Sequence, residues 1–303
     1  MTQKNIGFIG VGLMGHGMAK NLIEKGWQVC VLGHRNRAPV EDLVRRGAVE
    51  AKDVADVVTQ SDIVFLCVTG TPEVEDLLYR PGGVLASCRP GQIVIDTSTS
   101  QPGSTLKSLD AFRAKEVRFV DAPLTRTPVE AEQGRLNTLV GADARTFAEI
   151  EPVLRAYCEN VFHVGDVGSG HTLKLVNNFV AVGSVALFSE ALVACAKLGV
   201  DPGQLVKLVS VGPLNSNMFQ MVAGGAAEGD FGRMKFALRN AAKDVRYFVT
   251  EMTNAQVAGV VTAAVNQSLN QALGLGFGAP DKMLASLVQA QAHLNGVDIP
   301  PKS

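Results

Sequence analysis

The chain has 303 residues, which is enough for two domains of ordinary size. Hydrophobic residues make up 47% of it and charged residues 19%, and this balance excludes a largely disordered chain. The formal net charge of -1 at pH 7 offers no basic surface, so we expect neither nucleic acid nor a membrane as a partner.

Cysteine spacing and apolar runs indicate the cellular compartment of the protein. The five cysteines are odd in number and show no paired spacing, which is typical of a reduced, cytoplasmic protein with structural thiols. The first residues lack the long apolar core of a signal peptide. Polar residues interrupt the most apolar stretch, 173–198, so we expect no membrane span.

Short apolar runs alternate with helix-like stretches through the first half of the chain. Buried strands are predicted at residues 6–9, 29–32, 63–68, 93–95, 119–120 and 138–140. This alternation predicts a mostly parallel, doubly wound sheet with helices on both faces.

The second half changes character near the glycines at 165–170. From about Ser169 onward the chain has long segments rich in Ala, Leu and Val with helical spacing, and no convincing strand. We therefore predict an α/β domain over residues 1–166 and an all-α domain over residues 167–303.

A glycine-rich loop follows the first strand directly and leads into a helix. It reads Gly10-Val11-Gly12-Leu13-Met14-Gly15, the pattern G-x-G-x-x-G. Gly10 permits a tight turn, Gly12 lets the backbone approach a pyrophosphate, and Gly15 lets helix and strand pack closely. The helix start offers free N–H groups to the phosphates. The pattern predicts a Rossmann-type dinucleotide site, and a glycine turn without a ligand is the alternative.

The end of the second strand indicates which dinucleotide binds. An acidic residue there would bind the ribose 2′-hydroxyl of NAD, but this chain reads His34-Arg35-Asn36-Arg37. Arginine suits the 2′-phosphate of NADP through charge-assisted hydrogen bonds. We therefore favour NADP over NAD, and the alternative is that Arg35 and Arg37 are solvated loop charges.

A lysine and two asparagines stand on the first helix of the second half. Lys174, Asn177 and Asn178 have the spacing i, i+3 and i+4, so they share one face among apolar neighbours. A lysine amine can supply the proton that an alkoxide needs after hydride transfer to a carbonyl. Taken alone, Lys174 could equally be a surface lysine.

Further motifs complete an ordered series along the chain. After the glycine loop come Asp96-Thr97-Ser98-Thr99, Asp121-Ala122-Pro123, Gly168-Ser169-Gly170 with Lys174 and Asn178, and Lys243-Asp244. Nearly the whole chain thereby resembles the β-hydroxyacid dehydrogenases, the group of 3-hydroxyisobutyrate dehydrogenase and tartronate semialdehyde reductase.

The resemblance implies roles for particular residues. Lys174 would be the catalytic acid/base, and Asn177 and Asn178 would hold the substrate. Thr99 and Lys243 would approach the nicotinamide half of the cofactor. The full set of expected cofactor contacts is Gly10, Gly12, Leu13, Met14, Gly15, His34, Arg35, Asn36, Val68, Thr69, Thr99 and Lys243.

The chain departs from the family after Asp121-Ala122-Pro123. Most relatives continue with V-S-G-G, but this chain has Leu124-Thr125-Arg126-Thr127, which resembles the segment of sulfolactaldehyde reductases. A guanidinium suits a sulfonate or a second carboxylate. We expect Thr125, Arg126 and Thr127 to bind an anionic substrate head. The alternative is an arginine that faces solvent or pairs with Glu130.

Together these patterns predict an enzyme that transfers a hydride between NAD(P) and a small acidic 3-hydroxy acid or its semialdehyde. The alternatives are a sulfonate or diacid semialdehyde reductase, an imine reductase and a non-catalytic dinucleotide-binding regulator. Lys174 speaks against the last two, because imine reductases generally lack it and a regulator needs no proton donor. No metal is implied. The family suggests a homodimer or homotetramer.

Overall fold

The computed structural model describes residues 4–300. The chain divides into two compact units, one ending at Lys174 and the other beginning at Leu175. The sequence places the boundary between residues 166 and 167, just before the helix that leads into the second unit.

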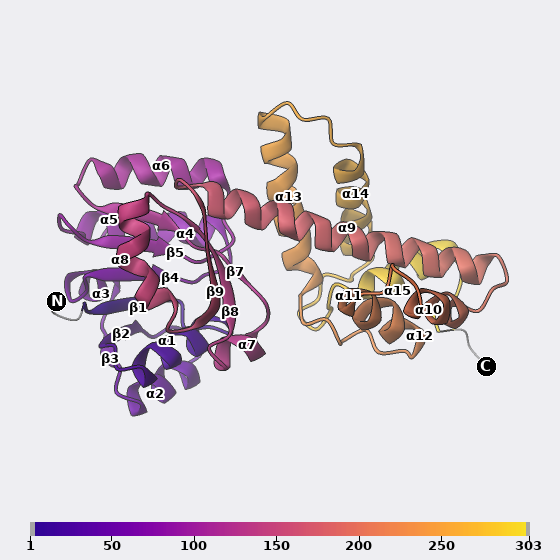
Figure 1. Cartoon of the computed structure of the whole chain (residues 1–303), viewed down its shortest axis with the longest axis horizontal. Helices are drawn as coiled ribbons and strands as arrows, with labels where there is room; N and C mark the ends of the chain where they lie inside the picture. The colour runs from indigo at the N-terminus through magenta and orange to yellow at the C-terminus, as the bar shows by residue number, and fades with distance from the viewer. Residues whose placement is uncertain (1–3, 301–303) are drawn as a thin grey trace. The chain divides into compact units, whose positions relative to one another are not determined.

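The first unit is built on a single sheet (Figure 1). Its strands are β1 (Ile6–Ile9), β2 (Val29–Leu32), β3 (Val49–Ala51), β4 (Ile63–Leu66), β5 (Ile93–Asp96), β6 (Arg118–Asp121), β7 (Leu124–Thr125), β8 (Leu136–Gly141) and β9 (Cys158–Gly165). They lie in the order β3-β2-β1-β4-β5-β6-β8-β7, and β9 pairs with β8. The strands from β3 to β6 are all parallel, whereas β8 runs antiparallel to β6 and β7.

Helices cover both faces of this sheet (Figure 1). They are α1 (Gly15–Glu24), α2 (Ala38–Arg45), α3 (Val54–Thr59), α4 (Thr71–Tyr79), α5 (Val84–Ser87), α6 (Pro102–Arg113), α7 (Pro128–Glu132) and α8 (Ala144–Leu154). Alternate residues of a strand pack into different clusters, because successive side chains point to opposite faces. Phe65 belongs to one buried cluster, while its neighbours Val64 and Leu66 belong to the other. The predicted doubly wound α/β fold is confirmed.

The six predicted strands are all present, and three further strands were not predicted. β3 is a short edge strand, and β7 has two residues. β9 is longer, but most of its side chains are exposed or half-buried. None of the three therefore carries the continuous apolar run that a buried parallel strand shows.

The second unit is helical (Figure 1). Its elements are α9 (Ser169–Lys197, which begins in the first unit), α10 (Pro202–Ser210), α11 (Asn217–Phe219), the π-helix η1 (Gln220–Gly224), α12 (Gly225–Ala227), α13 (Leu238–Asn254), α14 (Val260–Gly274) and α15 (Ser286–Asn295). Side chains of α9, α13, α14 and α15 form one apolar core. Between 175 and 300 the structure has no strand, which confirms the predicted all-α character.

Helix α9 is unusually long and apolar. Of the helices within residues 4–300, it is the one whose length and composition would suffice to cross a membrane. The core helix of a folded domain meets the same requirement, so composition does not decide between the two. Its first turns carry Lys174, Asn177 and Asn178, and Glu190 lies further along. The expectation of no span rests on these four polar residues.

Candidate active site

The predicted cofactor residues of the first unit meet at one edge of the sheet. The chain continues from β1 to β2 on one side, while β4 lies on the other side of β1, so β1 and β4 flank a topological switch point. Open α/β sheets bind ligands at such points, beyond the carboxyl ends of the strands. The glycine loop follows β1 here, residues 34–36 follow β2, residues 68 and 69 follow β4, and Thr99 follows β5.

The three glycines of the loop differ in what surrounds them. Gly10 has φ +102°, and a Cβ there would lie 2.2 Å from the carbonyl oxygen of Cys67. A Cβ on Gly15 would lie 2.1 Å from the carbonyl oxygen of Gly10. The fold itself therefore requires glycine at positions 10 and 15. A Cβ on Gly12 would meet nothing within 4 Å, and the neighbouring Leu13 is 82% exposed. The open cradle above Gly12 fits a pyrophosphate.

A single methyl group at position 12 tests this cradle. Gly12→Ala places it in open space, so the melting temperature should stay within about 1 °C of the parent, because no packing is lost. Dinucleotide affinity should fall by about tenfold or more, because the backbone can no longer approach the phosphates. Fluorescence titration with NADPH measures this affinity. Gly103→Ala is the matched control, since its Cβ would also meet nothing within 4 Å. Equal affinities for the two variants would exclude the cradle.

The two arginines of the loop after β2 differ in their surroundings. Arg37 donates to both carboxylate oxygens of Glu50, at 2.7 and 2.9 Å, and this pairing lowers the pKa of Glu50. Arg35 is exposed and makes no hydrogen bond or ion pair with residues 4–300. Arg35 is therefore the guanidinium available for a ligand. The pairing of Arg37 with Glu50 was not predicted, because Glu50 lies on β3 and this strand was not predicted from the sequence.

Helix α9 begins against a buried carboxylate from the sheet. Asp121, the last residue of β6, accepts the N–H of Gly168 and the N–H of His171, each at 2.7 Å. A Cβ on Gly141 would lie 2.3 Å from Asp121 Oδ1, and a Cβ on Gly170 would lie 2.9 Å from Oδ2. Burial raises the pKa of Asp121, while His171 and the two N–H donors lower it. Asp121 thus caps the helix one turn before Lys174.

Lys174 is half-buried and is the last residue of the first unit. Asn177 and Asn178 follow one turn later on α9, within the second unit. Helical geometry therefore sets Lys174 and Asn178 on one face of a single helix, as the spacing predicts.

Inside the second unit, Asn178 and Lys243 share an acidic partner. The buried Asn178 donates to Asp244 Oδ2 at 2.7 Å, and Lys243 Nζ lies 3.1 Å from Asp244 Oδ1. Lys243 also lies over the ring of Tyr247, 5.1 Å from its centre. Asn177 is exposed and donates to Asn178 Oδ1 at 3.4 Å. Asp244 therefore fixes the side chains of Asn178 and Lys243 together.

The residues after Asp121-Ala122-Pro123 are engaged within the chain. Thr125 lies on β7, and its hydroxyl accepts from Asn137 at 3.2 Å. Arg126 has φ +79° and donates to the carboxylate of Glu159 and to a backbone carbonyl. Thr127 forms a capping box with Glu130 at the start of α7. A substrate anion that binds Arg126 would therefore have to displace the carboxylate of Glu159. The role of this segment in substrate binding stays a prediction.

Four buried residues near these sites were not assigned roles from the sequence: Asp96, Asp121, His171 and Asp244. The three aspartates belong to motifs of the sequence, but the motifs gave them no role. For Asp96 and Asp121 a further signal was available. A charged residue directly after a buried strand was the available signal, because burying a carboxylate is costly unless it is bonded. Their partners lie far away in sequence and could not be read locally.

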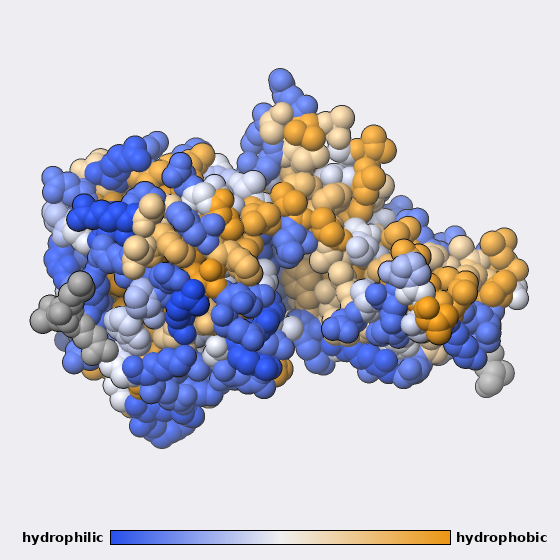
Figure 2. All heavy atoms as spheres, in the orientation of Figure 1, coloured by the Kyte–Doolittle hydropathy of each residue, from blue (hydrophilic) through white to orange (hydrophobic). Residues whose placement is uncertain are grey.

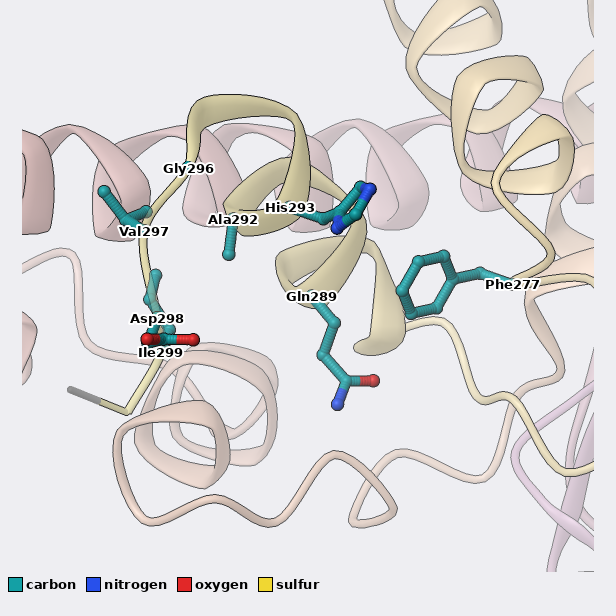
Figure 3. Close-up of a pocket in the computed structure, with 8 residues that line it drawn as sticks. All are labelled: Phe277, Gln289, Ala292, His293, Gly296, Val297, Asp298 and Ile299. Atoms are coloured by element: carbon teal, nitrogen blue, oxygen red, sulfur yellow. The ribbon is translucent and has the colours of Figure 1, made fainter. Parts of the chain in front are cut away.

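A cavity of about 420 Å³ lies elsewhere in the second unit, at the C-terminal end of α15. In Figure 3, Gln289 and Phe277 extend toward its open space. Its lining residues are Phe277, Gln289, Ala292, His293, Gly296, Val297, Asp298 and Ile299, and none of them is a predicted site residue. Within residues 4–300, no cluster of His, Cys, Asp or Glu has metal-binding geometry.

The switch-point loop and the strand order define a dinucleotide-binding domain, and family models place the chain among the nicotinamide-dependent dehydrogenases. Residues 5–165 match the NAD-binding domain of 6-phosphogluconate dehydrogenase. Residues 168–288 match the NAD-binding domain of NADP-dependent 3-hydroxyisobutyrate dehydrogenase. The cofactor is a nicotinamide dinucleotide.

Individual relatives span nearly the whole chain. It is 32% identical to 2-(hydroxymethyl)glutarate dehydrogenase of Eubacterium barkeri, over 97% of either chain. It is 29% identical to glyoxylate/succinic semialdehyde reductase 1 of Arabidopsis thaliana, over 91% of this chain and 95% of the relative. The structure of Mycobacterium tuberculosis 3-hydroxyisobutyrate dehydrogenase shares the fold, with a TM-score of 0.84 at 20% identity over 95% of this chain and 99% of that chain. The chain belongs to the β-hydroxyacid dehydrogenase family.

Proposed function

We propose that the protein transfers a hydride between NAD(P) and a small acidic 3-hydroxy acid or its semialdehyde, with Lys174 as general acid/base. The observation that carries this proposal is the placement of Lys174 on α9. It lies one turn after the start that Asp121 caps and one turn before Asn178, whose amide is fixed by Asp244. The relatives named above support the substrate class, since their names describe small acids and a semialdehyde.

The chemistry divides between the cofactor and the chain. The bound nicotinamide supplies or accepts the hydride. In the oxidative direction the Lys174 amine accepts the proton of the substrate hydroxyl, and in the reductive direction the ammonium returns it. The amides of Asn177 and Asn178 donate hydrogen bonds to substrate oxygens, which limits the reacting groups to productive orientations.

A substrate panel tests the reaction class. Semialdehydes of small acids, hydroxylated diacids, sulfolactaldehyde and cyclic imines are each offered with NADPH and with NADH, and nicotinamide absorbance is followed. We expect turnover with one of the anionic aldehydes. Turnover of imines alone would favour an imine reductase, and dinucleotide binding without turnover of any compound would favour a regulator.

The cofactor preference rests on Arg35. We propose NADP, because Arg35 is exposed at the end of β2 while Arg37 is held by Glu50. Arg35→Ala should weaken NADPH binding by about tenfold, since a charge-assisted hydrogen bond to the 2′-phosphate is lost. Binding of NADH should change less than about twofold. Fluorescence titration measures both affinities. An equal loss of affinity for NADPH and NADH would show that Arg35 does not bind the 2′-phosphate.

The finer substrate proposal rests on Arg126. We propose that its guanidinium exchanges Glu159 for a second anionic group of the substrate, a carboxylate or a sulfonate. Arg126→Ala should then lower kcat/KM by about thirtyfold, equivalent to about 2 kcal/mol, for a doubly anionic substrate. A singly charged aldehyde should be less affected. Glu159→Gln is the companion variant and should not lower kcat/KM. Unchanged kcat/KM in Arg126→Ala would leave the arginine a structural partner of Glu159.

We also propose a homodimer or homotetramer working in the cytoplasm. Figure 2 shows apolar side chains gathered along α9 and around α10. Val180 and Leu187 on α9, and Leu208 on α10, are strongly exposed. An exposed apolar surface of this kind suits contact with a second subunit. The cysteines are free, which suits a reducing compartment.

A further inference from the structure

Two buried carboxylates enclose one buried imidazole in the first unit. Asp96 ends β5, Asp121 ends β6, and His171 lies in the first turn of α9. All three are at most 1% exposed. His171 Nε2 lies 3.7 Å from Asp96 Oδ2, and Nδ1 lies 3.8 Å from Asp121 Oδ2. We call these three side chains the buried triad.

Both carboxyl groups accept hydrogen bonds from their surroundings. Asp121 accepts a backbone N–H on each oxygen. Asp96 accepts the N–H of Ser98 on Oδ1 and the hydroxyl of Ser100 on Oδ2, each at 2.8 Å. A buried carboxyl group is costly unless it is bonded in this way, so these contacts fix where the two side chains lie.

Both ring nitrogens of His171 have a hydrogen-bond partner in the first unit. Nε2 lies 3.2 Å from the carbonyl oxygen of Ser98, which accepts only, so Nε2 donates to it. Nδ1 lies 2.7 Å from the hydroxyl of Thr105 on α6. The ring therefore joins the first turn of α9 to the end of β5 and to α6.

We propose that His171 is a positioning residue whose ring holds the first turn of α9, and thereby Lys174, against the end of β5 and against α6. His171 and Lys174 are three residues apart in one helix, so a shift of that turn moves both. Loss of the two ring hydrogen bonds would loosen the turn. The effect on turnover, though not on the turn itself, rests on the proposed role of Lys174.

Three elements of the first unit surround the ring. The side chains that face His171 are Asp96 from β5, Asp121 from β6 and Thr105 from α6. The start of α9 is therefore held by contacts with the sheet ends and with α6.

Hydrogen exchange along residues 168–174 tests the docking directly. His171→Leu removes both ring contacts, so we expect exchange protection in this segment to fall at least tenfold. His171→Gln keeps an N–H donor for the carbonyl of Ser98, so it should restore most of the protection. His163→Gln, a histidine replaced on β9 in the same unit, is the matched control and should leave protection in this segment unchanged.

Turnover provides the second readout. His171→Gln should keep kcat close to the parent value, because the hydrogen bond to the carbonyl of Ser98 is kept. His171→Leu should lose about tenfold or more in kcat, with the dissociation constant of NADPH within about twofold of the parent. Protection in His171→Leu equal to the parent, or no recovery of protection and kcat in His171→Gln, would overturn the inference. Full turnover by a Lys174 variant would instead overturn the proposed function, and the exchange data would still decide on His171.

Discussion

Lys174→Met should lower kcat by about 100- to 10,000-fold, the contribution expected of a general acid/base. Methionine keeps the length and much of the apolar stem but has no proton to exchange. The dissociation constant of NADPH should change less than about twofold, because the glycine loop binds the dinucleotide without this amine. Stopped-flow measurement of nicotinamide absorbance gives the rate of the hydride-transfer step.

Lys197→Met is the matched control for this variant. Lys197 is the last residue of the same helix and donates to the carbonyl oxygen of Asn295 at 2.8 Å. Its loss should leave kcat unchanged. A Lys174→Met enzyme as fast as Lys197→Met would show that another group moves the proton.

Asp121→Asn should cause the largest loss of stability among the single changes considered. The variant removes the charge that faces His171 and turns an amide donor toward one of two buried N–H groups. One buried N–H then loses its acceptor and the other loses a bond to a carboxylate, which together cost about 3 kcal/mol. For a domain of this size the melting temperature should fall by about 6–12 °C. Differential scanning calorimetry measures the change.

Asp143→Asn separates this effect from ordinary helix capping. Asp143 caps α8 by accepting the N–H of Thr146 at 2.9 Å, and it is exposed. Asparagine is nearly as good a cap as aspartate, so this variant should lose less than about 0.5 kcal/mol. Similar losses for both variants would mean that Asp121 is no more than a helix cap, without a charge that matters.

The sequence reveals those parts of the fold that repeat a pattern locally. The runs that became β1, β2 and β4 are continuous and apolar because both faces of a parallel sheet are covered. β9 could not be recognised, because it lies at an edge of the sheet with mostly exposed or half-buried side chains. Exposed positions accept almost any residue, so they leave no periodic signal.

In the candidate site, too, the local features could be predicted from the sequence and the distant ones could not. The glycine loop and the spacing of Lys174 and Asn178 are local, and helical geometry alone sets the two side chains on one face. The charge partners are not local: Asp121 reaches α9, Asp244 reaches Asn178, and Glu159 reaches Arg126 across long stretches of chain. Charged side chains find partners through tertiary folding, which no spacing rule encodes.

Chemical rescue tests whether the Lys174 amine carries the proton. Lys174→Ala leaves a space where the amine stood, and small primary amines can enter such a space and carry the proton. If Lys174 is the acid/base, added methylamine should raise the rate of the Lys174→Ala enzyme in proportion to its concentration, and the rate should rise with the basicity of the amine in the oxidative direction. If Lys174→Ala still binds NADPH, turns over as fast as the parent and shows no change in rate with any added amine, Lys174 is not the acid/base.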